Sequence, residues 1–194
     1  GVIGNVASVG LEKIKVIVEK GFIKTNGFMQ TNIDNIYAIG DVCGPPLLAH
    51  VASAEAIVAV EHICNTENYK EMKYSNIPGC TYSEPEVASV GLTEEKAKEA
   101  GYDIKVGKFP FRALGKSLAD GSHEGFVKIS YDGKYGELLG CHIIGHNASN
   151  LISEISIART LETTYSEILN TIHPHPTLSE AIHEATGDAF DEAI

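Results

Sequence analysis

The alternation of apolar and polar residues indicates a short α/β segment at the start of the chain. Residues 13–19, KIKVIVE, alternate as a half-buried strand does, and GFIKTN, just downstream, is placed to pair with it. Residues 33–41, IDNIYAIGD, carry a short apolar run that predicts a buried strand. Residues 47–64 are rich in Ala and apolar on nearly all sides, which predicts a buried helix.

The pattern then changes, which predicts a domain boundary. Residues 65–79 are polar and aperiodic. We therefore expect one segment over residues 1–66 and a separate domain over residues 67–194.

The second domain is predicted to contain mostly strands first and helices afterwards. Strands are expected over residues 80–92, with an interruption at Pro85, over 103–111, and in a hairpin over 125–145 that turns at Asp132-Gly133. Helices are expected over 93–101, 147–162 and from Thr164, where Thr93 and a Thr164–Glu167 capping box provide the N-terminal signals. This order predicts an α+β fold, an antiparallel sheet with helices packed on it.

Composition and charge exclude several classes of protein. The 194 residues are 43% hydrophobic and 21% charged, as in ordinary globular proteins. Only 15 basic residues stand against 26 acidic ones, giving a net charge of −11 without a basic stripe. This argues against nucleic-acid binding, which needs positive surface, and leaves room for a basic protein partner. No apolar run is long enough for a membrane span, and no signal peptide is visible after Gly1, so we expect no membrane association.

The cysteines indicate a reducing compartment. None of the four belongs to a CxxC pair, which argues against a zinc ribbon and a thioredoxin-like motif. We expect no metal site and four free, mostly buried thiols. The four are Cys43, Cys64, Cys80 and Cys141.

A first candidate site is the Gly-Asp pair that ends the predicted strand over 33–41. Gly40 lets a ligand approach the backbone, and Asp41 offers an acceptor for a sugar-like hydroxyl. The turn at 44–46 leads into a helix starting near Leu47 or Leu48, whose N-terminal amides suit an anionic group. The alternative is a plain strand–loop–helix in which Asp41 only caps the turn.

A second candidate site is HPHPTLSE, residues 173–180. The flanking prolines disfavour helix at His175, and Thr177 with Glu180 forms an S/T-x-x-E pattern in which Thr177 is the N-cap. Glu180 then points back towards the His175 imidazole, fixing its tautomer and making it a better base. The alternative is that Glu180 only completes a capping box. His173 is a second candidate, and the remaining histidines have no partner spacing and are expected to be structural.

Six motifs occur in the order and spacing of a known family. These are NIYAIGDV…GPPLLAH, TYSEPEVASVG, VGKFPF, GFVKI, LLGCHIIG and HPHPTLSEA. Together they resemble the carboxyl-terminal part of the dihydrolipoamide dehydrogenases, which are flavoproteins of the pyridine nucleotide-disulfide oxidoreductase class I family. Glutathione reductase shares the His–Glu pair but matches the other segments less well.

The resemblance implies roles for both candidate sites. Residues 1–66 are the closing segment of an FAD-binding domain, in which Asp41, after Gly40, accepts a bond from a ribityl hydroxyl. Backbone at the start of the helix, contributed by Leu47, Leu48, Ala49 and His50, faces the flavin. Residues 67–194 are the interface domain of a homodimer.

In the family, the His–Glu pair exchanges protons with the thiols of dihydrolipoamide. His175 is then the acid/base that reaches the flavin of the partner subunit, and Glu180 orients it. FAD and NAD are the cofactors, and the partners are the dihydrolipoyl groups and subunit-binding domain of the acyltransferase of 2-oxo acid dehydrogenase complexes. Both the cytoplasm and the mitochondrial matrix fit this function.

The chain also departs from the family's pattern. It has no G-x-G fingerprint and no C-x4-C redox pair, so the FAD and NAD sites are incomplete and the chain alone is expected to be inactive. Two alternatives stay open: a stand-alone homodimerisation or docking module without flavin, and another disulfide reductase such as glutathione reductase.

Overall fold

The computed structural model describes residues 2–193 and divides the chain into two compact units, residues 1–74 and 75–194. The sequence placed the end of the first segment at residue 66. Residues 71–74 pack with the first unit, since the Met72 amide donates to the Gly27 carbonyl and Tyr74 hydrogen-bonds Glu55.

The first unit has little regular strand structure. Among its described residues, the strands are β1 (Val18–Glu19) and β2 (Phe22–Ile23), which pair antiparallel, and they are followed by the 3-10 helix η1 (Gly40–Cys43). The predicted strand over 33–41 is wrong, because the described backbone there makes only one isolated bridge, between Gln30 and Tyr37. An apolar run becomes a strand only where a neighbouring strand accepts its hydrogen bonds.

The predicted helix over 47–64 is confirmed as α1 (Ala49–Cys64), which ends at Asn65 in the left-handed conformation. Its predicted burial on all sides is wrong. Only Val51, Glu55 and Ala59 are buried within the chain, and the apolar side chains of Ile57, Val60 and Ile63 are exposed.

The second unit is built on a five-stranded antiparallel sheet, which confirms the α+β prediction. The strand order is β3-β4-β7-β6-β5, and β6 and β7 form the predicted hairpin. The strands are β3 (Gly79–Thr81), β4 (Glu86–Gly91), β5 (Ile104–Pro110), β6 (Gly125–Asp132) and β7 (Leu138–Gly145). The helices are α2 (Glu94–Glu99), α3 (Gly115–Asp120), α4 (Ala148–Thr160), α5 (Tyr165–Asn170) and α6 (Glu180–Ala189), with a short 3-10 turn η3 (Phe111–Ala113). A further 3-10 turn, η2 (Tyr74–Asn76), begins at the last residue of the first unit.

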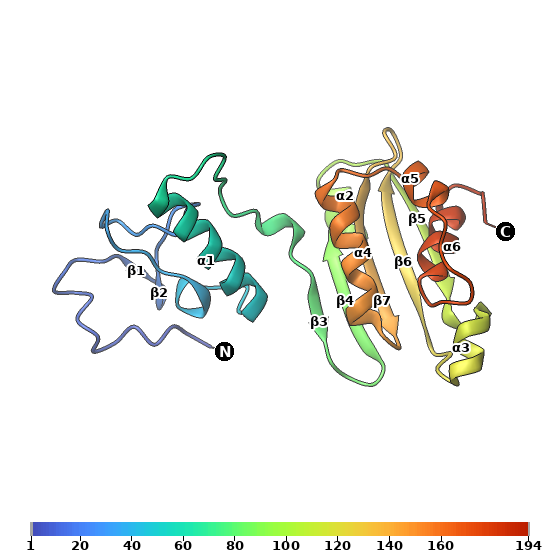
Figure 1. Cartoon of the computed structure of the whole chain (residues 1–194), viewed down its shortest axis with the longest axis horizontal. Coiled ribbons are helices and arrows are strands. Elements are labelled where there is room, and N and C mark those ends of the chain that lie inside the picture. The colour runs from blue at the N-terminus through green and yellow to red at the C-terminus, as the bar shows by residue number, and fades with distance from the viewer. Residues whose placement is uncertain (1, 194) are drawn as a thin grey trace. The chain divides into compact units, whose positions relative to one another are not determined.

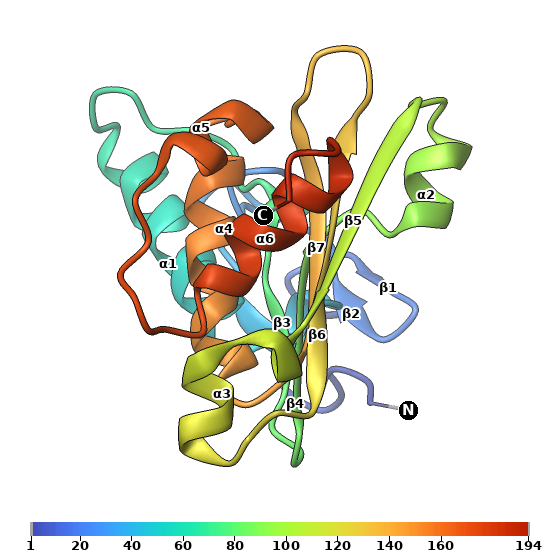
Figure 2. The ribbon, with the colours of Figure 1, turned by 90° about the vertical axis from the view of Figure 1, so that its right-hand side faces the viewer.

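Helices cover the two faces of this sheet unequally. Helices α4 and α6 lie along one face with α5 beside them, and α2 lies on the other (Figures 1 and 2). The alternation of β6 explains this: Val127, Ile129 and Tyr131 are fully buried, while Lys128 between them reaches Glu94 of α2 at 2.7 Å.

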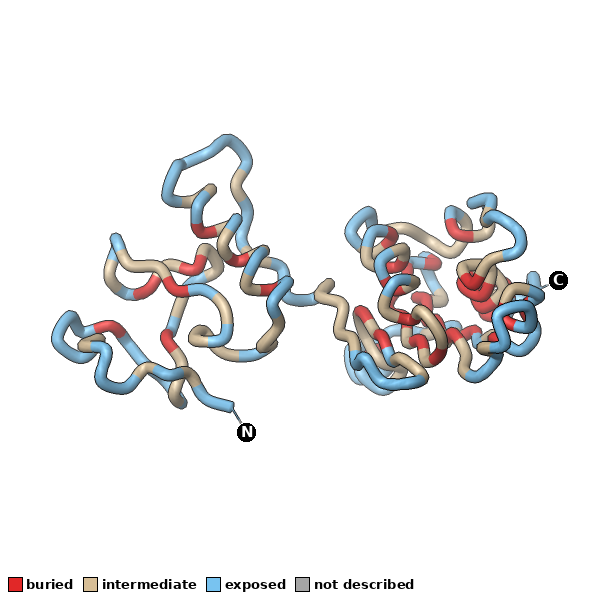
Figure 3. Tube along the Cα trace, turned by 60° about the horizontal axis from the view of Figure 1, so that its bottom comes forward, coloured by how far each residue is buried: buried red, intermediate tan, exposed pale blue. Residues whose placement is uncertain are grey.

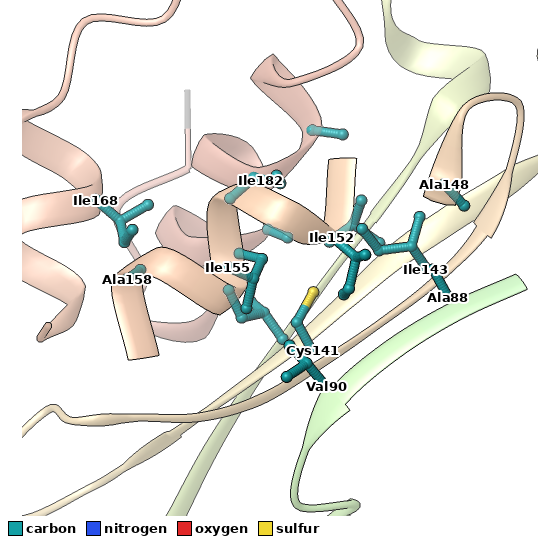
Figure 4. Close-up of a cluster of buried hydrophobic side chains, with 14 of the residues drawn as sticks. Ala88, Val90, Cys141, Ile143, Ala148, Ile152, Ile155, Ala158, Ile168 and Ile182 are labelled. Atoms are coloured by element: carbon teal, nitrogen blue, oxygen red, sulfur yellow. The ribbon is translucent and has the colours of Figure 1, made fainter. Parts of the chain in front are cut away.

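The core lies between the sheet and α4 and α6. Cys141 and Ile143 of β7 meet Ile152 and Ile155 of α4, as Figure 4 shows. Buried positions are more frequent in residues 75–193, chiefly on the sheet, α4 and α6, than in residues 2–74 (Figure 3). Most of the hydrophobic stabilisation of the chain therefore comes from the sheet and the helices packed on it.

Local helix signals are largely as predicted. The Thr93 hydroxyl accepts from the Lys96 amide, and Thr164 and Glu167 form the capping box at α5. All four cysteines are free, but only Cys141 is buried, so the prediction of mostly buried thiols is wrong. Within residues 2–193, no helix combines the length and apolar character needed to cross a bilayer.

Candidate functional site

The segment between α5 and α6 places His175 outside any helix, as the flanking prolines predicted. The His175–Pro176 peptide bond is cis. The imidazole is 77% exposed to solvent, and its Nδ1 lies 2.8 Å from Oε1 of Glu180. The predicted contact between His175 and Glu180 is therefore present.

Glu180 is fixed by two hydrogen bonds, one to each oxygen of its carboxylate. Oε1 meets His175, and Oε2 accepts from the backbone amide of Thr177 at 2.8 Å. The hydrogen bond from the Thr177 amide, helped by that from His175, lowers the pKa of Glu180 below its ordinary value. An ionised Glu180 accepts a hydrogen bond from Nδ1–H, which leaves Nε2 as the nitrogen available to a substrate.

Thr177 is not the N-cap that the sequence predicted. Helix α6 begins at Glu180 with Ser179 as N-cap, and the Thr177 hydroxyl donates instead to the Pro174 carbonyl at 2.7 Å. The Glu180 carboxylate nevertheless accepts the expected hydrogen bond from the Thr177 amide. Glu180, fixed by its bond to the Thr177 amide, thus holds His175 in place, although His175 lies before the helix.

His173 is held more tightly than His175. Its side chain is only 7% exposed, and its Nε2 lies 2.9 Å from Oε1 of Glu154 on α4. Its Nδ1 lies 3.1 Å from the Thr171 carbonyl oxygen. The hydrogen bond to Glu154 raises the pKa of His173 above its ordinary value.

A surface pocket of about 310 Å³ adjoins these residues. His173, Glu180, His183 and Glu184 contribute polar groups to it, and Leu169 to Ile172 complete the wall. Two imidazoles and two carboxylates therefore line one concave surface beside His175.

In the first unit, the predicted Gly-Asp turn is braced by a residue that sequence reasoning missed. The buried carboxylate of Glu55 on α1 accepts from the Gly40 amide at 2.6 Å and from the Tyr74 hydroxyl at 2.7 Å. The only sequence signal was an acid within an otherwise apolar helix. Burial, with a contribution from Glu55, raises the pKa of the nearby Cys43 thiol to about 11, so Cys43 is not a reactive thiolate.

The predicted flavin-facing residues lie together where η1 leads into α1. Gly40 has a positive φ of 73°, and Asp41, Ala49 and His50 are exposed, while Leu47 and Leu48 are half-buried. Leu48 is the N-cap of α1 and gives no side-chain cap. The start of this 16-residue helix thus offers backbone donors and a positive dipole end to a ligand, with Asp41 as an acceptor.

These features agree with the comparisons to known proteins. The dimerisation domain of the pyridine nucleotide-disulphide oxidoreductases matches residues 77–186, more than half of the chain. The chain belongs to this family. A second domain of the family, described as pyridine nucleotide-disulphide oxidoreductase, matches residues 1–56.

Curated relatives named dihydrolipoyl dehydrogenase align with the whole chain. The protein from Zymomonas mobilis is 50% identical over 194 residues, covering 100% of this chain and 42% of its own length. The protein from Rhizobium etli is 48% identical, with 100% and 40% covered. The chain therefore spans about two fifths of the length of these relatives.

Solved structures share the fold. LpdA from Mycobacterium tuberculosis superimposes with a TM-score of 0.89 at 26% identity, over 95% of this chain and 40% of that one. The flavoprotein disulfide reductase RclA from Escherichia coli gives 0.88 at 24% identity, over 96% and 43%, which supports the fold alone. The recognition of the family from its motifs is thereby confirmed.

Proposed function

We propose that this chain is the carboxyl-terminal portion of an FAD-dependent dihydrolipoamide dehydrogenase that passes electrons to NAD. The observation that carries the proposal is the His175–Glu180 contact, formed in a chain whose relatives carry that enzyme's name. His175 is the catalytic acid/base, and Glu180 is the residue that orients it.

The geometry supports proton transfer at one defined atom. Glu180 binds Nδ1–H, so the lone pair on Nε2 can take the proton of a dihydrolipoamide thiol. The thiolate that remains is the nucleophile for a disulfide, which a thiol is not. His175 is exposed, as a group must be that meets a substrate brought by another protein.

The start of α1 fits part of an FAD site. Asp41 would accept from a ribityl hydroxyl, and the backbone from Leu47 to His50 would face the isoalloxazine ring, where the positive helix end favours negative charge. Gly40 belongs to the same turn, held in place by Glu55. Bound FAD supplies a two-electron acceptor, and NAD would bind in a part of the enzyme that this chain does not contain.

The same proposal extends to partners and location. The match to a dimerisation domain supports a homodimer, in which His175 would serve the flavin of the partner subunit. The net charge of −11 suits docking of a basic subunit-binding domain of the acyltransferase in the cytoplasm or mitochondrial matrix. The chain alone would not turn over dihydrolipoamide, since it has no C-x4-C pair.

The test is dihydrolipoamide oxidation by the complete enzyme with His175→Gln. Loss of general acid–base catalysis should lower turnover by roughly 10²- to 10⁴-fold while the flavin absorbance stays. His123→Gln is the control, since His123 lies on the loop between α3 and β6 of the same unit. Turnover near the wild-type value in His175→Gln would refute the assigned role.

A second candidate function is a homodimerisation module without flavin. It is favoured by residues 75–194, which enclose their own core. The two functions differ in visible absorption: a purified dimer of this chain without flavin bands supports the module for the chain by itself, and stoichiometric flavin contradicts it.

A further inference from the structure

His173 is placed so that both of its ring nitrogens face acceptors. Nδ1 lies 3.1 Å from the Thr171 carbonyl oxygen, and Nε2 lies 2.9 Å from a carboxylate oxygen of Glu154. A carbonyl and an ionised carboxylate can only accept hydrogen bonds. A neutral imidazole carries one N–H and satisfies one of these contacts, whereas the imidazolium carries two and satisfies both.

The surroundings favour the charged form. Glu154 faces His173 from α4, and Glu180 and Glu184 share its pocket from α6. The His183 ring, from α6, meets it edge-on at 5.6 Å between centroids. The hydrogen bond to Glu154 raises the pKa of His173 against the opposing effect of burial. The charge of Glu154, the Thr171 hydrogen bond and the charge of Glu180 add to the rise.

The His173 ring links the segment before His175 to helix α4. Glu154 lies on α4, which packs against the sheet, while His173 lies two residues before His175. On the other side of His175, Glu180 holds the ring from α6. The segment that carries His175 is thus fastened at both ends, to α4 and to α6.

We propose that His173 is a positioning residue that works as an imidazolium, clamping the segment before His175 to Glu154 and so fixing where the His175 ring stands. This inference rests on the proposed function and adds a second histidine to it. His173 does not contact substrate, because Glu154 and Thr171 occupy both of its nitrogens. When the His173 ring loses a proton, it can donate to only one of Thr171 and Glu154, and the clamp on the segment before His175 is weakened.

The first test asks for the protonation state directly. Histidine-selective ¹⁵N labelling and NMR should show both His173 ring nitrogens protonated at pH 7. Glu154→Gln keeps an acceptor oxygen but removes the charge, and should move the His173 titration to lower pH. Glu184 lines the same pocket but pairs with His183 and not with His173. Glu184→Gln should therefore shift the His173 titration less. A neutral His173 at pH 7 in the unmodified chain would overturn the proposal.

The second test measures positioning in the complete enzyme. His173→Gln should lower kcat roughly tenfold with little change in KM, because misplacing a catalytic group by about 1 Å costs up to ~10²-fold. Glu154→Gln should bring the alkaline loss of kcat to lower pH, which a purely structural role would not do. Values of kcat and pH profiles that match the wild type in both His173→Gln and Glu154→Gln would refute the inference.

The two proposals fail differently. If His175→Gln retains turnover, the proposed function itself is wrong. If His175→Gln is inactive while His173→Gln matches the wild type, the function stands and only the role of His173 is lost.

Discussion

Glu180 holds the His175 ring across 2.8 Å, although His175 lies five residues before the helix on which Glu180 stands. The second oxygen of the same carboxylate accepts from the Thr177 amide. Two donors thus meet the two oxygens separately. Only a carboxylate can satisfy both, since an amide side chain has one oxygen and one donor group.

This relationship predicts the effect of Glu180→Gln. The amide can accept from His175 or from Thr177, and its NH₂ group then faces the other donor. Losing one charged hydrogen bond, worth about 1.5–3 kcal/mol, corresponds to a fall in kcat of roughly 10- to 100-fold. Steady-state kinetics of dihydrolipoamide oxidation in the complete enzyme measures it.

Glu167→Gln is the matched control. In the capping box of α5, a single oxygen of Glu167 accepts from both the amide and the hydroxyl of Thr164, at 2.8 Å and 2.6 Å. A glutamine can keep that arrangement, so turnover should stay within about twofold of the wild type. Equal losses in the two variants would mean that Glu180 only stabilises the turn before α6 and does not orient His175.

A second prediction concerns the buried hydroxyl pair between β6 and α6. Tyr131 and Thr186 lie 2.7 Å apart, and the Thr186 hydroxyl also lies 2.8 Å from the Ile182 carbonyl. Since Thr186 donates to that carbonyl, the Tyr131 hydroxyl must donate to Thr186. Thr186→Val therefore leaves a buried donor without a partner, whereas Tyr131→Phe leaves none.

Thr186→Val should lower the free energy of unfolding by about 1–3 kcal/mol and Tyr131→Phe by about 0.5–1.5 kcal/mol. In the double variant the two losses should not add, because the orphaned donor is gone. Urea denaturation gives all three values. A larger loss in Tyr131→Phe would reverse the assigned direction of the hydrogen bond.

The sequence could predict the contacts that span a few residues. His175 and Glu180 lie within one short motif, and the caps at Thr93 and Thr164 depend on spacings of three residues. The individual strands of the second unit and the β6–β7 hairpin also follow from local alternation and turn signals. In each case the residues that determine the feature are neighbours in the chain.

Contacts between distant segments were beyond such reasoning. The Glu154–His173 contact joins residues 19 positions apart, and Glu55 reaches back 15 positions to Gly40. No periodicity encodes either contact. The strand expected over 33–41 failed for the same reason, because its apolar pattern does not reveal whether another strand lies alongside it.

A third prediction concerns the close approach of α6 to β5, which sets the position of the helix that carries Glu180. A Cβ atom on Gly107 would overlap the Ala185 carbonyl oxygen and lie 2.6 Å from the Ala189 amide. Gly107→Ala should destabilise the fold by about 1–3 kcal/mol through overpacking against backbone. Gly115→Ala, at the start of α3, meets nothing within 4 Å and should cost little. Equal denaturation midpoints for the two variants would contradict the packing.

The last prediction concerns acid stability and the start of α4. Asn147, the N-cap, gives no side-chain cap, and Glu86 on β4 accepts from the Ser149 amide at 2.9 Å instead. That hydrogen bond lowers the pKa of Glu86. Because the folded pKa is lower than the unfolded one, the stabilisation is present above the unfolded value of about 4.3 and is lost as pH falls through the folded value.

Glu86→Gln should therefore lower the free energy of unfolding by about 1 kcal/mol at pH 7, as loss of a helix cap does. The difference from the wild type should shrink as the pH falls below about 4, because the wild-type carboxyl is then protonated as well. Urea denaturation at several pH values measures this difference. Glu84→Gln, an exposed position just before β4, is the control and should follow the wild type throughout. A difference that stays constant down to pH 3 would show that the charge of Glu86 does not cap α4.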